Sequence, residues 1–170
     1  MQIRPSTAGD TDAIIAMYPE VFPDEDLVPV VRELLEDPPV RISLVAVIDE
    51  RIVGNVIFTT CSVNEGDIRV GLLGPLAVAP DCQQQGIGSA LVNDGLRWLE
   101  DADFGMACVL GDPAYYGRFG FVQEDHVEPP YPLPAGWAGA WQSQFLGDTA
   151  TLTGKLVVPA QWQHAELWSE

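Results

Sequence analysis

The stretch CQQQGIGSAL, residues 82–91, most constrains the fold of this chain, because it places two glycines between a strand-like run and a helix-like run. The preceding run, residues 68–80, alternates apolar side chains at a period of two, and the following run, residues 86–102, repeats them at helical spacing. The expected apolar face of this helix consists of Ile87, Leu91, Trp98 and Ala102. Glycines at such a junction indicate that the backbone closely approaches a ligand or a neighbouring element.

The glycine pair does not match the two commonest nucleotide-binding loops. Leu91 stands where the third glycine of a dinucleotide fingerprint would be, and the acidic residues Glu100, Asp101 and Asp103 lie in or just after the helix. No Lys-Ser or Lys-Thr follows Gly88, which excludes a Walker-type triphosphate loop. Backbone N–H groups that converge at a helix start bind a pyrophosphate without a lysine. A tight turn whose glycines only allow close packing is the alternative.

Composition and charge narrow the class of protein. The chain has 170 residues, 47% of them hydrophobic, which predicts one folded domain over residues 1–170. A formal net charge of −17 argues against nucleic-acid binding and favours a cationic substrate or adaptation to a salt-rich setting. No apolar run has the length of a membrane span and the first ten residues lack a secretory signal, so we expect a cytoplasmic protein that does not bind membranes.

The cysteines and histidines form no metal-binding pattern. Cys61 and Cys108 lie in apolar runs and are expected to be buried, while Cys82 begins the glycine stretch. His126 and His164 are far apart and belong to no triad or zinc motif. We therefore expect no metal site.

The order of the predicted elements indicates a mixed α/β (α+β) fold. Strands are expected at residues 3–7, 40–49, 52–63, 68–80, 106–112, 121–127 and 149–160. Helices are expected at residues 8–22, 27–37 and 86–102, with a short helix or turn at 113–120. The aromatic and proline-rich residues 128–147 are predicted to form a long loop. Gly74 and Pro75 are expected to interrupt the hydrogen-bond ladder of their strand, through a bulge or a splayed strand.

Two segments resemble a known family. The stretch PLAVAPDCQQQGIGSAL resembles the acyl-coenzyme A motif Gln/Arg-x-x-Gly-x-Gly/Ala of the GCN5-related N-acetyltransferases (the GNAT family), with Gln83, Gly86 and Gly88 at its defined positions. The stretch VLGDPAYYGRFGF is similar to the later strand–helix segment of that family, which ends in Tyr-x-x-x-Gly-Phe and is filled here by Tyr116, Gly120 and Phe121. Together they look especially like the YhbS-type branch, and the resemblance covers residues 52–122.

The resemblance implies a mostly antiparallel central sheet with splayed central strands and flanking helices. It further implies acetyl-CoA as co-substrate. The residues expected to flank the pantetheine and thioester are Leu76, Ala77 and Val78. The residues expected to hold the pyrophosphate, mostly through main-chain N–H groups, are Gln83, Gln84, Gln85, Gly86, Ile87, Gly88 and Ser89.

The implied reaction is direct transfer of the acetyl group to a primary amine of a small molecule or a peptide. Tyr116 matches the family tyrosine that acts as general acid on the departing thiolate. The strand RVGLLGPLAV has no carboxylate, so the general base is either a water relay or one of the carboxylates Glu65, Asp67 and Asp112.

The acceptor site is expected to use the first two helices and residues 128–147, where Tyr131, Trp137 and Trp141 line a pocket or cover the core. A non-catalytic acyl-CoA-binding sensor or protein-interaction module is the alternative function. A homodimer is a further possibility of the family resemblance.

Overall fold

The computed structural model describes residues 1–147 and 151–169, which form two compact units. The first unit combines Met1–Phe58 with Gly74–Leu96, and the second combines Thr59–Leu73 with Arg97–Glu170. Strands β3 (Arg51–Val63) and β4 (Arg69–Val78) and helix α3 (Ile87–Asp101) each contribute residues to both units. The prediction of one domain over residues 1–170 stays a prediction.

In the first unit the strand order is β1-β2-β3-β4. Strand β1 (Gln2–Pro5) pairs antiparallel with β2 (Arg41–Ile48). The β2–β3 hairpin turns at Asp49 and Glu50, both at positive φ (49° and 65°), as a two-residue type I′ turn requires.

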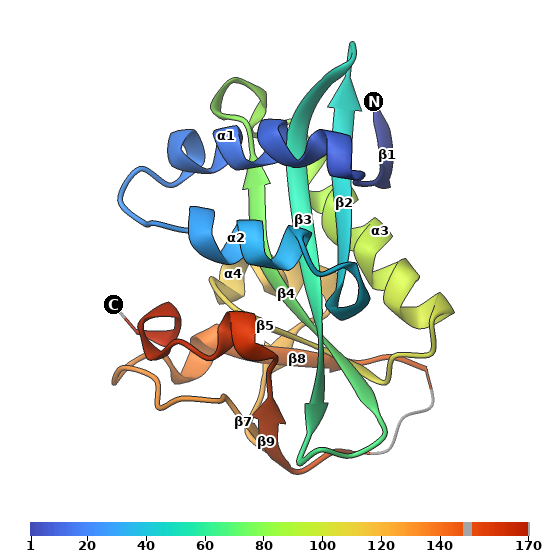
Figure 1. The fold of residues 1–170 in the computed structure, drawn as a ribbon. Coiled ribbons are helices and arrows are strands. Elements are labelled where there is room, and N and C mark those ends of the chain that lie inside the picture. Colours follow the sequence, from blue (N-terminus) through green and yellow to red (C-terminus); the bar gives the residue numbers. More distant parts are fainter. Residues whose placement is uncertain (148–150, 170) are drawn as a thin grey trace. The chain divides into compact units, whose positions relative to one another are not determined.

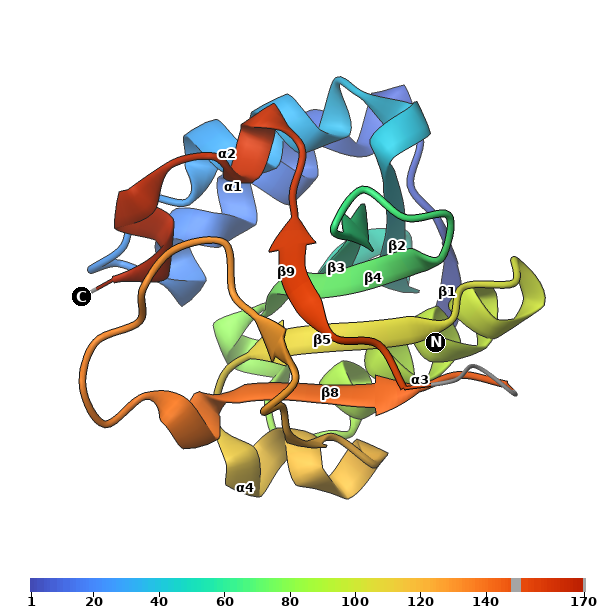
Figure 2. The ribbon, with the colours of Figure 1, turned by 90° about the horizontal axis from the view of Figure 1, so that it is seen from below.

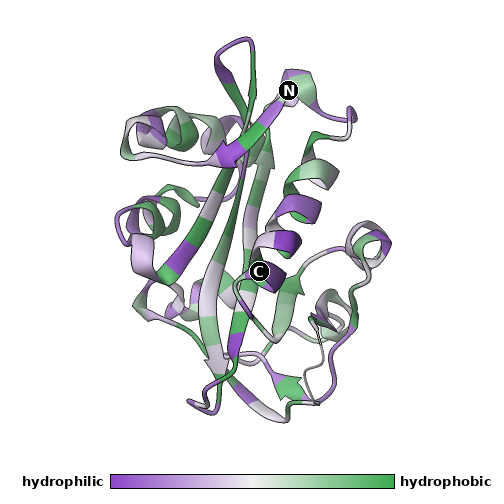
Figure 3. Ribbon diagram, turned by 90° about the vertical axis from the view of Figure 1, so that its right-hand side faces the viewer, coloured by the Kyte–Doolittle hydropathy of each residue, from purple (hydrophilic) through white to green (hydrophobic). Residues whose placement is uncertain are grey.

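Helices cover both faces of the strands of the first unit. Helices α1 (Thr11–Val21) and α2 (Val28–Leu35) pack on each other over one face, and the beginning of α3 lies over the other (Figures 1 and 2). The strands carry mostly hydrophobic residues, whereas the helices alternate hydrophobic and hydrophilic ones (Figure 3). The predicted helices at 8–22 and 27–37 are thus confirmed in place, with shorter bounds.

Two polar groups fix the position of α1. Asp10, the residue before its first turn, accepts hydrogen bonds from the Arg4 guanidinium at 2.7 and 3.0 Å, and this partner lowers the pKa of Asp10 to about 2. Within the core, the Tyr18 hydroxyl donates to Asn55 Oδ1 (2.7 Å), and Asn55 Nδ2 donates to the Leu44 carbonyl (3.0 Å). Burial raises the pKa of Tyr18, so its phenol stays protonated and the link between helix and sheet persists.

Glycines bring α3 close to the sheet of the first unit. A Cβ at Gly54 of β3 would lie 2.9 Å from Leu91 Cδ1, and a Cβ at Gly95 of α3 would overlap the Phe58 ring. The buried face of α3 comprises Ile87, Leu91, Val92, Leu96 and Leu99. The prediction that Trp98 belongs to this face is wrong, since Trp98 is 46% exposed. The buried face is centred on Leu91 and Gly95, which turns Trp98 towards solvent.

The second unit contains a mixed sheet of its own residues (Figure 2). Strand β5 (Met106–Leu110) pairs parallel with β4 over Val70–Leu73, and the ladder ends next to the Gly74–Pro75 pair expected to interrupt it. Strand β8 (Trp141–Phe145) pairs antiparallel with β5 and with β6 (Val122–Gln123). Among the strand pairs, antiparallel ladders outnumber parallel ones, which confirms the predicted mostly antiparallel mixed sheet with flanking helices.

Two shorter strands complete the second unit. Strand β9 (Gly154–Val157) pairs antiparallel with the end of β3 at Ser62 and Val63, and parallel with β7 (Val127–Glu128). The predicted strand at 149–160 is thus confirmed over four residues, while Thr149 and Ala150 lie outside the described residues.

Two predictions for residues 121–147 are corrected. The predicted strand at 121–127 is divided into β6 and β7, because the carboxylate of Glu124 between them accepts the N–H groups of His126 and Val127 and turns the chain there. The predicted loop at 128–147 contains β8, whose five residues pair with β5. The pattern WQSQF lacks apolar alternation, and neighbouring strands rather than its own hydrophobicity make it a strand.

A cluster of three tryptophans forms much of the core of the second unit. Trp168 contacts both Trp141 and Trp162 edge-to-face, with ring centroids 5.9 Å apart. Each indole N–H has an acceptor: the Val127 carbonyl, Thr59 Oγ1 and the Trp162 carbonyl. Residues 159–168 are therefore anchored by buried side chains.

Cys61 and Cys108 are buried as predicted, and burial raises the pKa of Cys61 to about 12. Over residues 1–147 and 151–169, no group of three or more potential metal-ligating side chains comes together. Within the same described ranges, none of the helices combines the length and apolar character needed to cross a bilayer.

Candidate active site

The residues expected to contact the cofactor all lie in the first unit, between the end of β4 and the start of α3. Leu76, Ala77 and Val78 end β4, Gln83–Gly86 form the following turn, and Ile87, Gly88 and Ser89 begin α3. Ala77 is 1% exposed, whereas Leu76 and Val78 on the other face of the strand are half-buried. The strand thus presents the side chains of Leu76 and Val78, and the backbone between them, on one side.

Two hydrogen bonds hold the turn against the end of β4. The Cys82 N–H donates to the Ala79 carbonyl (2.9 Å), and Gln83 Nε2 donates to the Val78 carbonyl (3.0 Å). The side chain of Gln83 therefore ties the turn to the end of β4. Any contact of Gln83 with a phosphate would come from its backbone.

The start of α3 has the geometry of an anion site. Gly86 has φ +82°, and a Cβ built there meets no atom within 4 Å. The hydrogen-bond ladder of α3 begins with the Ala90 N–H, which donates to the Gly86 carbonyl at 3.0 Å. The N–H groups of Ile87 and Gly88 precede that first bond and carry the positive end of the helix dipole. Open space over Gly86 beside these groups fits a pyrophosphate.

An arginine from the neighbouring hairpin supplies the cation that the turn lacks. Residues 80–89 contain one carboxylate, Asp81, and no lysine or arginine. Arg51 at the start of β3 donates to both Asp81 oxygens (2.8 and 2.9 Å) and lowers the pKa of Asp81 to about 2. The pair neutralises the turn's only carboxylate. The sequence gives no local signal for this pair, since 30 residues separate its members.

Tyr116, the proposed acid, lies in the second unit at the end of α4 (Pro113–Tyr116). Its ring packs edge-to-face against Tyr115 (5.0 Å between centroids) and Phe121 (6.0 Å). Burial raises the pKa of Tyr116, which keeps the phenol protonated and able to donate.

A neighbouring glycine makes room for the Tyr116 ring. A Cβ at Gly111 would lie 2.5 Å from Cε2 of Tyr116, and the rigid ring could not yield to it. Asp112 Oδ1 accepts the Ala114 N–H (2.9 Å) and caps α4, as expected for an N-cap aspartate. Sequence reasoning singled out Tyr116 but missed Gly111.

The carboxylates considered as a base occupy different environments. Asp112 serves as the α4 cap, and Glu65 and Asp67 are exposed in the turn after β3. Over residues 1–147 and 151–169 the buried carboxylate is Glu124, which is 9% exposed and which no sequence motif indicated. Its oxygens accept from the N–H groups of His126 (2.6 Å) and Val127 (2.7 Å) and from the hydroxyl of Ser143 (2.5 Å).

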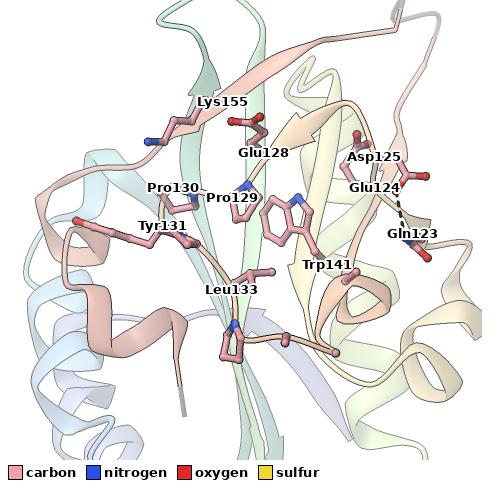
Figure 4. Close-up of a pocket in the computed structure, with 15 residues that line it drawn as sticks. Gln123, Glu124, Asp125, Glu128, Pro129, Pro130, Tyr131, Leu133, Trp141 and Lys155 are labelled. Atoms are coloured by element: carbon pink, nitrogen blue, oxygen red, sulfur yellow. Dashed lines mark hydrogen bonds between the residues drawn. The ribbon is translucent and has the colours of Figure 1, made fainter.

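The second unit contains a pocket of about 470 Å³ between residues 123–141 and β9 (Figure 4). Tyr131 and Trp141 line it, which is one of the two expected alternatives, whereas Trp137 and the two helices also expected at the acceptor site contribute none of its fifteen lining residues. Glu128 and Lys155 lie at the same rim, where β7 and β9 pair. Lys155 is the single lysine of the sequence. It lies in β9, and nothing in the sequence predicts that this strand borders the loop.

The fold, the glycine turn and the tyrosine segment define a class of protein, and comparison with known families agrees. The model of the acetyltransferase (GNAT) family matches residues 11–121. The chain belongs to this family.

Among curated proteins, the chain is similar to YhbS of Escherichia coli K12, described as an uncharacterised N-acetyltransferase. The two are 33% identical over 154 residues, covering 88% of this chain and 90% of the relative. Among solved structures, it matches the crystal structure of the Escherichia coli YhbS in complex with CoA, with a TM-score of 0.86 and 30% identity over 96% of this chain and 92% of that one. A GNAT acetyltransferase of Brucella melitensis in complex with acetyl-CoA shares the fold, with a TM-score of 0.79 and 24% identity, covering 95% and 97% of the two chains.

Proposed function

We propose that the protein transfers the acetyl group of acetyl-CoA directly to a primary amine. The observation that carries this proposal is the turn at residues 83–89, where a left-handed glycine with open space above it precedes a helix whose hydrogen-bond ladder begins only at the Ala90 N–H. This geometry suits a pyrophosphate in a stretch without a lysine or arginine. The complexes of its relatives with CoA and acetyl-CoA support the same cofactor.

In this proposal the first unit binds the co-substrate. Residues 83–89 hold the pyrophosphate by their backbone, and Leu76, Ala77 and Val78 flank the pantetheine arm and the thioester. Acetyl-CoA supplies an acetyl group already activated as a thioester. Arg51 reduces the repulsion that Asp81 would exert on the phosphates.

Tyr116 is the proposed general acid. Its raised pKa keeps a proton on the phenol at neutral pH, and the phenol donates that proton to the sulfur as the carbon–sulfur bond breaks. The amine must lose a proton to attack. A water relay does this in our proposal, since β4 carries no carboxylate and Asp112 is engaged as a helix cap.

The absence of a carboxylate from β4 also favours a second candidate, a module that binds acyl-CoA as a sensor or protein-interaction domain without turnover. The two candidates differ in one measurable property. The enzyme releases CoA thiol when an amine is added, whereas the module binds CoA and releases none.

The test combines calorimetric titration with CoA and thiol release from acetyl-CoA across a panel of amines and peptide N-termini, at low and high salt. We expect CoA binding and amine-dependent thiol release, with binding strengthened by salt because the chain carries a charge of −17. Binding without release for every amine would favour the module. A thermal shift with NADH and none with CoA would overturn both. Sedimentation of the same samples determines whether the chain is a homodimer.

A further inference from the structure

The pocket formed by the loop after β7 combines acidic groups and an aromatic wall with four prolines, which we call the proline collar (Figure 4). The collar consists of Pro129, Pro130, Pro132 and Pro134. We propose that this pocket binds the acceptor substrate, and that the acceptor is a monocationic amine carried on an apolar or aromatic body. The inference rests on the proposed acetyl transfer and names the substrate class for it.

Charge selects the sign of the ligand. Glu124, Asp125 and Glu128 line the pocket together with one cation, Lys155. Glu124 is buried and its oxygens are held by hydrogen bonds, so it supplies a fixed negative charge rather than a mobile partner. Asp125 and Glu128 are exposed and reach solvent at the rim. An ammonium group is attracted to this set, and an anion is repelled.

Apolar groups select the body of the ligand. Tyr131 is half-buried in the wall, Leu133 faces the same space, and Trp141 is only 2% exposed and forms the floor. The Trp141 indole N–H is already donated to the Val127 carbonyl at 2.8 Å and is not offered to a ligand. Four of the lining residues are prolines, which have no N–H to donate. Such walls favour a hydrocarbon or aromatic body, with the Tyr131 ring available to an ammonium group, over a polyhydroxylated amino sugar.

The proline collar restricts the backbone around the pocket, and the pocket itself is small. Pro129, Pro130, Pro132 and Pro134 each have a restricted φ, which reduces the conformational freedom lost on binding. A volume of about 470 Å³ suits a small molecule. A large folded protein surface would not fill it, so the acceptor amine is small or sits at the end of a side chain.

The test uses two ligands of the same shape and opposite charge, 2-phenylethylamine and 3-phenylpropanoate, titrated calorimetrically with and without CoA. We expect the amine to bind at least about tenfold more tightly than the carboxylate, a difference of roughly 1.4 kcal/mol. Acetylation of 2-phenylethylamine is measured in parallel with that of spermidine and glucosamine, and we expect the highest kcat/KM for 2-phenylethylamine.

Variants of the rim should change the affinity for 2-phenylethylamine in opposite directions. Glu128→Gln removes a carboxylate and should weaken binding about threefold, whereas Lys155→Gln removes the cation and should strengthen it about threefold, as is usual for exposed charges. Tyr131→Ser should weaken it about tenfold through loss of the aromatic wall. Glu100→Gln removes the same charge from an exposed position outside the pocket and should leave the affinity unchanged.

The outcomes separate the pocket from the reaction. Equal or tighter binding of 3-phenylpropanoate, or no response to Glu128→Gln and Lys155→Gln, would overturn the pocket assignment even if acetyl transfer occurs. Acetylation of spermidine or glucosamine but not of 2-phenylethylamine would overturn the substrate class and leave the proposed function intact. Charge-sensitive binding of 2-phenylethylamine without acetylation of any amine would contradict the proposed function and retain the pocket.

Discussion

The turn at residues 80–89 and the loop at residues 129–140 build their candidate sites in different ways. The turn offers backbone N–H groups and empty space over Gly86, while its side chains Gln83 and Asp81 are occupied by neighbours. The loop offers side chains, and its pocket is completed by Lys155 from β9 and Trp141 from β8. A site made of backbone groups comes from consecutive residues and can be recognised in the sequence. A site made of side chains depends on which distant residues the fold brings together.

This difference has a functional meaning. A pyrophosphate is the same in every acyl-CoA, so a contiguous glycine motif suffices to recognise it. Acceptors vary, and a pocket assembled from several elements changes with each of them. The following variants test whether the two regions divide the work in this way.

The largest expected effect is at Tyr116. Tyr116→Phe removes the proposed proton donor and retains the ring that contacts Phe121, so kcat should fall about 100-fold or more, as for loss of a general acid. The KM for acetyl-CoA should change little, because the turn of the first unit is untouched. Steady-state kinetics against both substrates measures the two effects.

The neighbouring Tyr115→Phe is the matched control for Tyr116→Phe and should change kcat less than about threefold. Because burial raises the pKa of Tyr116, its phenol remains protonated as pH rises through 10, and no alkaline loss of kcat below pH 10 should come from it. Equal losses in both variants would show that the tyrosines only pack.

The second prediction concerns the seat of the Tyr116 ring. Gly111→Ala places a methyl group 2.5 Å from the ring and should displace it, lowering kcat about tenfold while the thermal midpoint falls by several degrees. CoA affinity measured by calorimetry should be unchanged. Gly117→Ala, where an added Cβ meets no atom within 4 Å, is the control and should preserve kcat.

The fold could be predicted from sequence where local pattern and neighbours agree. The glycine turn, the α4 segment and the hairpin at Asp49–Glu50 each carry their signal in adjacent residues, and all three appear in the structure. Strand β8 could not be predicted, because its pairing with β5 rather than its own composition makes it a strand. Trp98 was assigned to the wrong face of α3. Helical spacing alone does not reveal that α3 approaches the sheet most closely at Gly95.

For the candidate site, too, the sequence indicated some residues and not others. Gln83–Ser89 and Tyr116 could be named from two motifs, since each motif is contiguous. Arg51, Glu124 and Lys155 could not, because each acts on residues far away in the chain or on a turn that no motif describes. The missing information is which distant segments the fold brings together, and local sequence patterns do not contain it.

The third prediction compares one glycine from each region. Gly86→Ala and Gly136→Ala both force a side chain onto a positive φ (82° and 92°) with open space around it, so each should cost about 1–2 kcal/mol of folding stability. Only Gly86→Ala should also weaken CoA binding, by about tenfold, because it shifts the N–H groups that face the phosphates. Equal CoA affinities of the two variants would remove the distinction between the regions.

The smallest expected effect tests whether the turn really relies on its backbone. Arg51→Gln leaves the Asp81 carboxylate uncompensated beside the phosphates and should weaken CoA binding about three- to fivefold at low salt, as befits an exposed pair. Asp81→Asn combined with Arg51→Gln removes both charges and should restore most of the affinity. If Arg51 instead binds a phosphate itself, the double variant stays weak and Asp81→Asn alone binds CoA more tightly than the unchanged protein. Titrations of the three variants at two salt concentrations distinguish a turn that binds by backbone alone from one that adds an arginine contact.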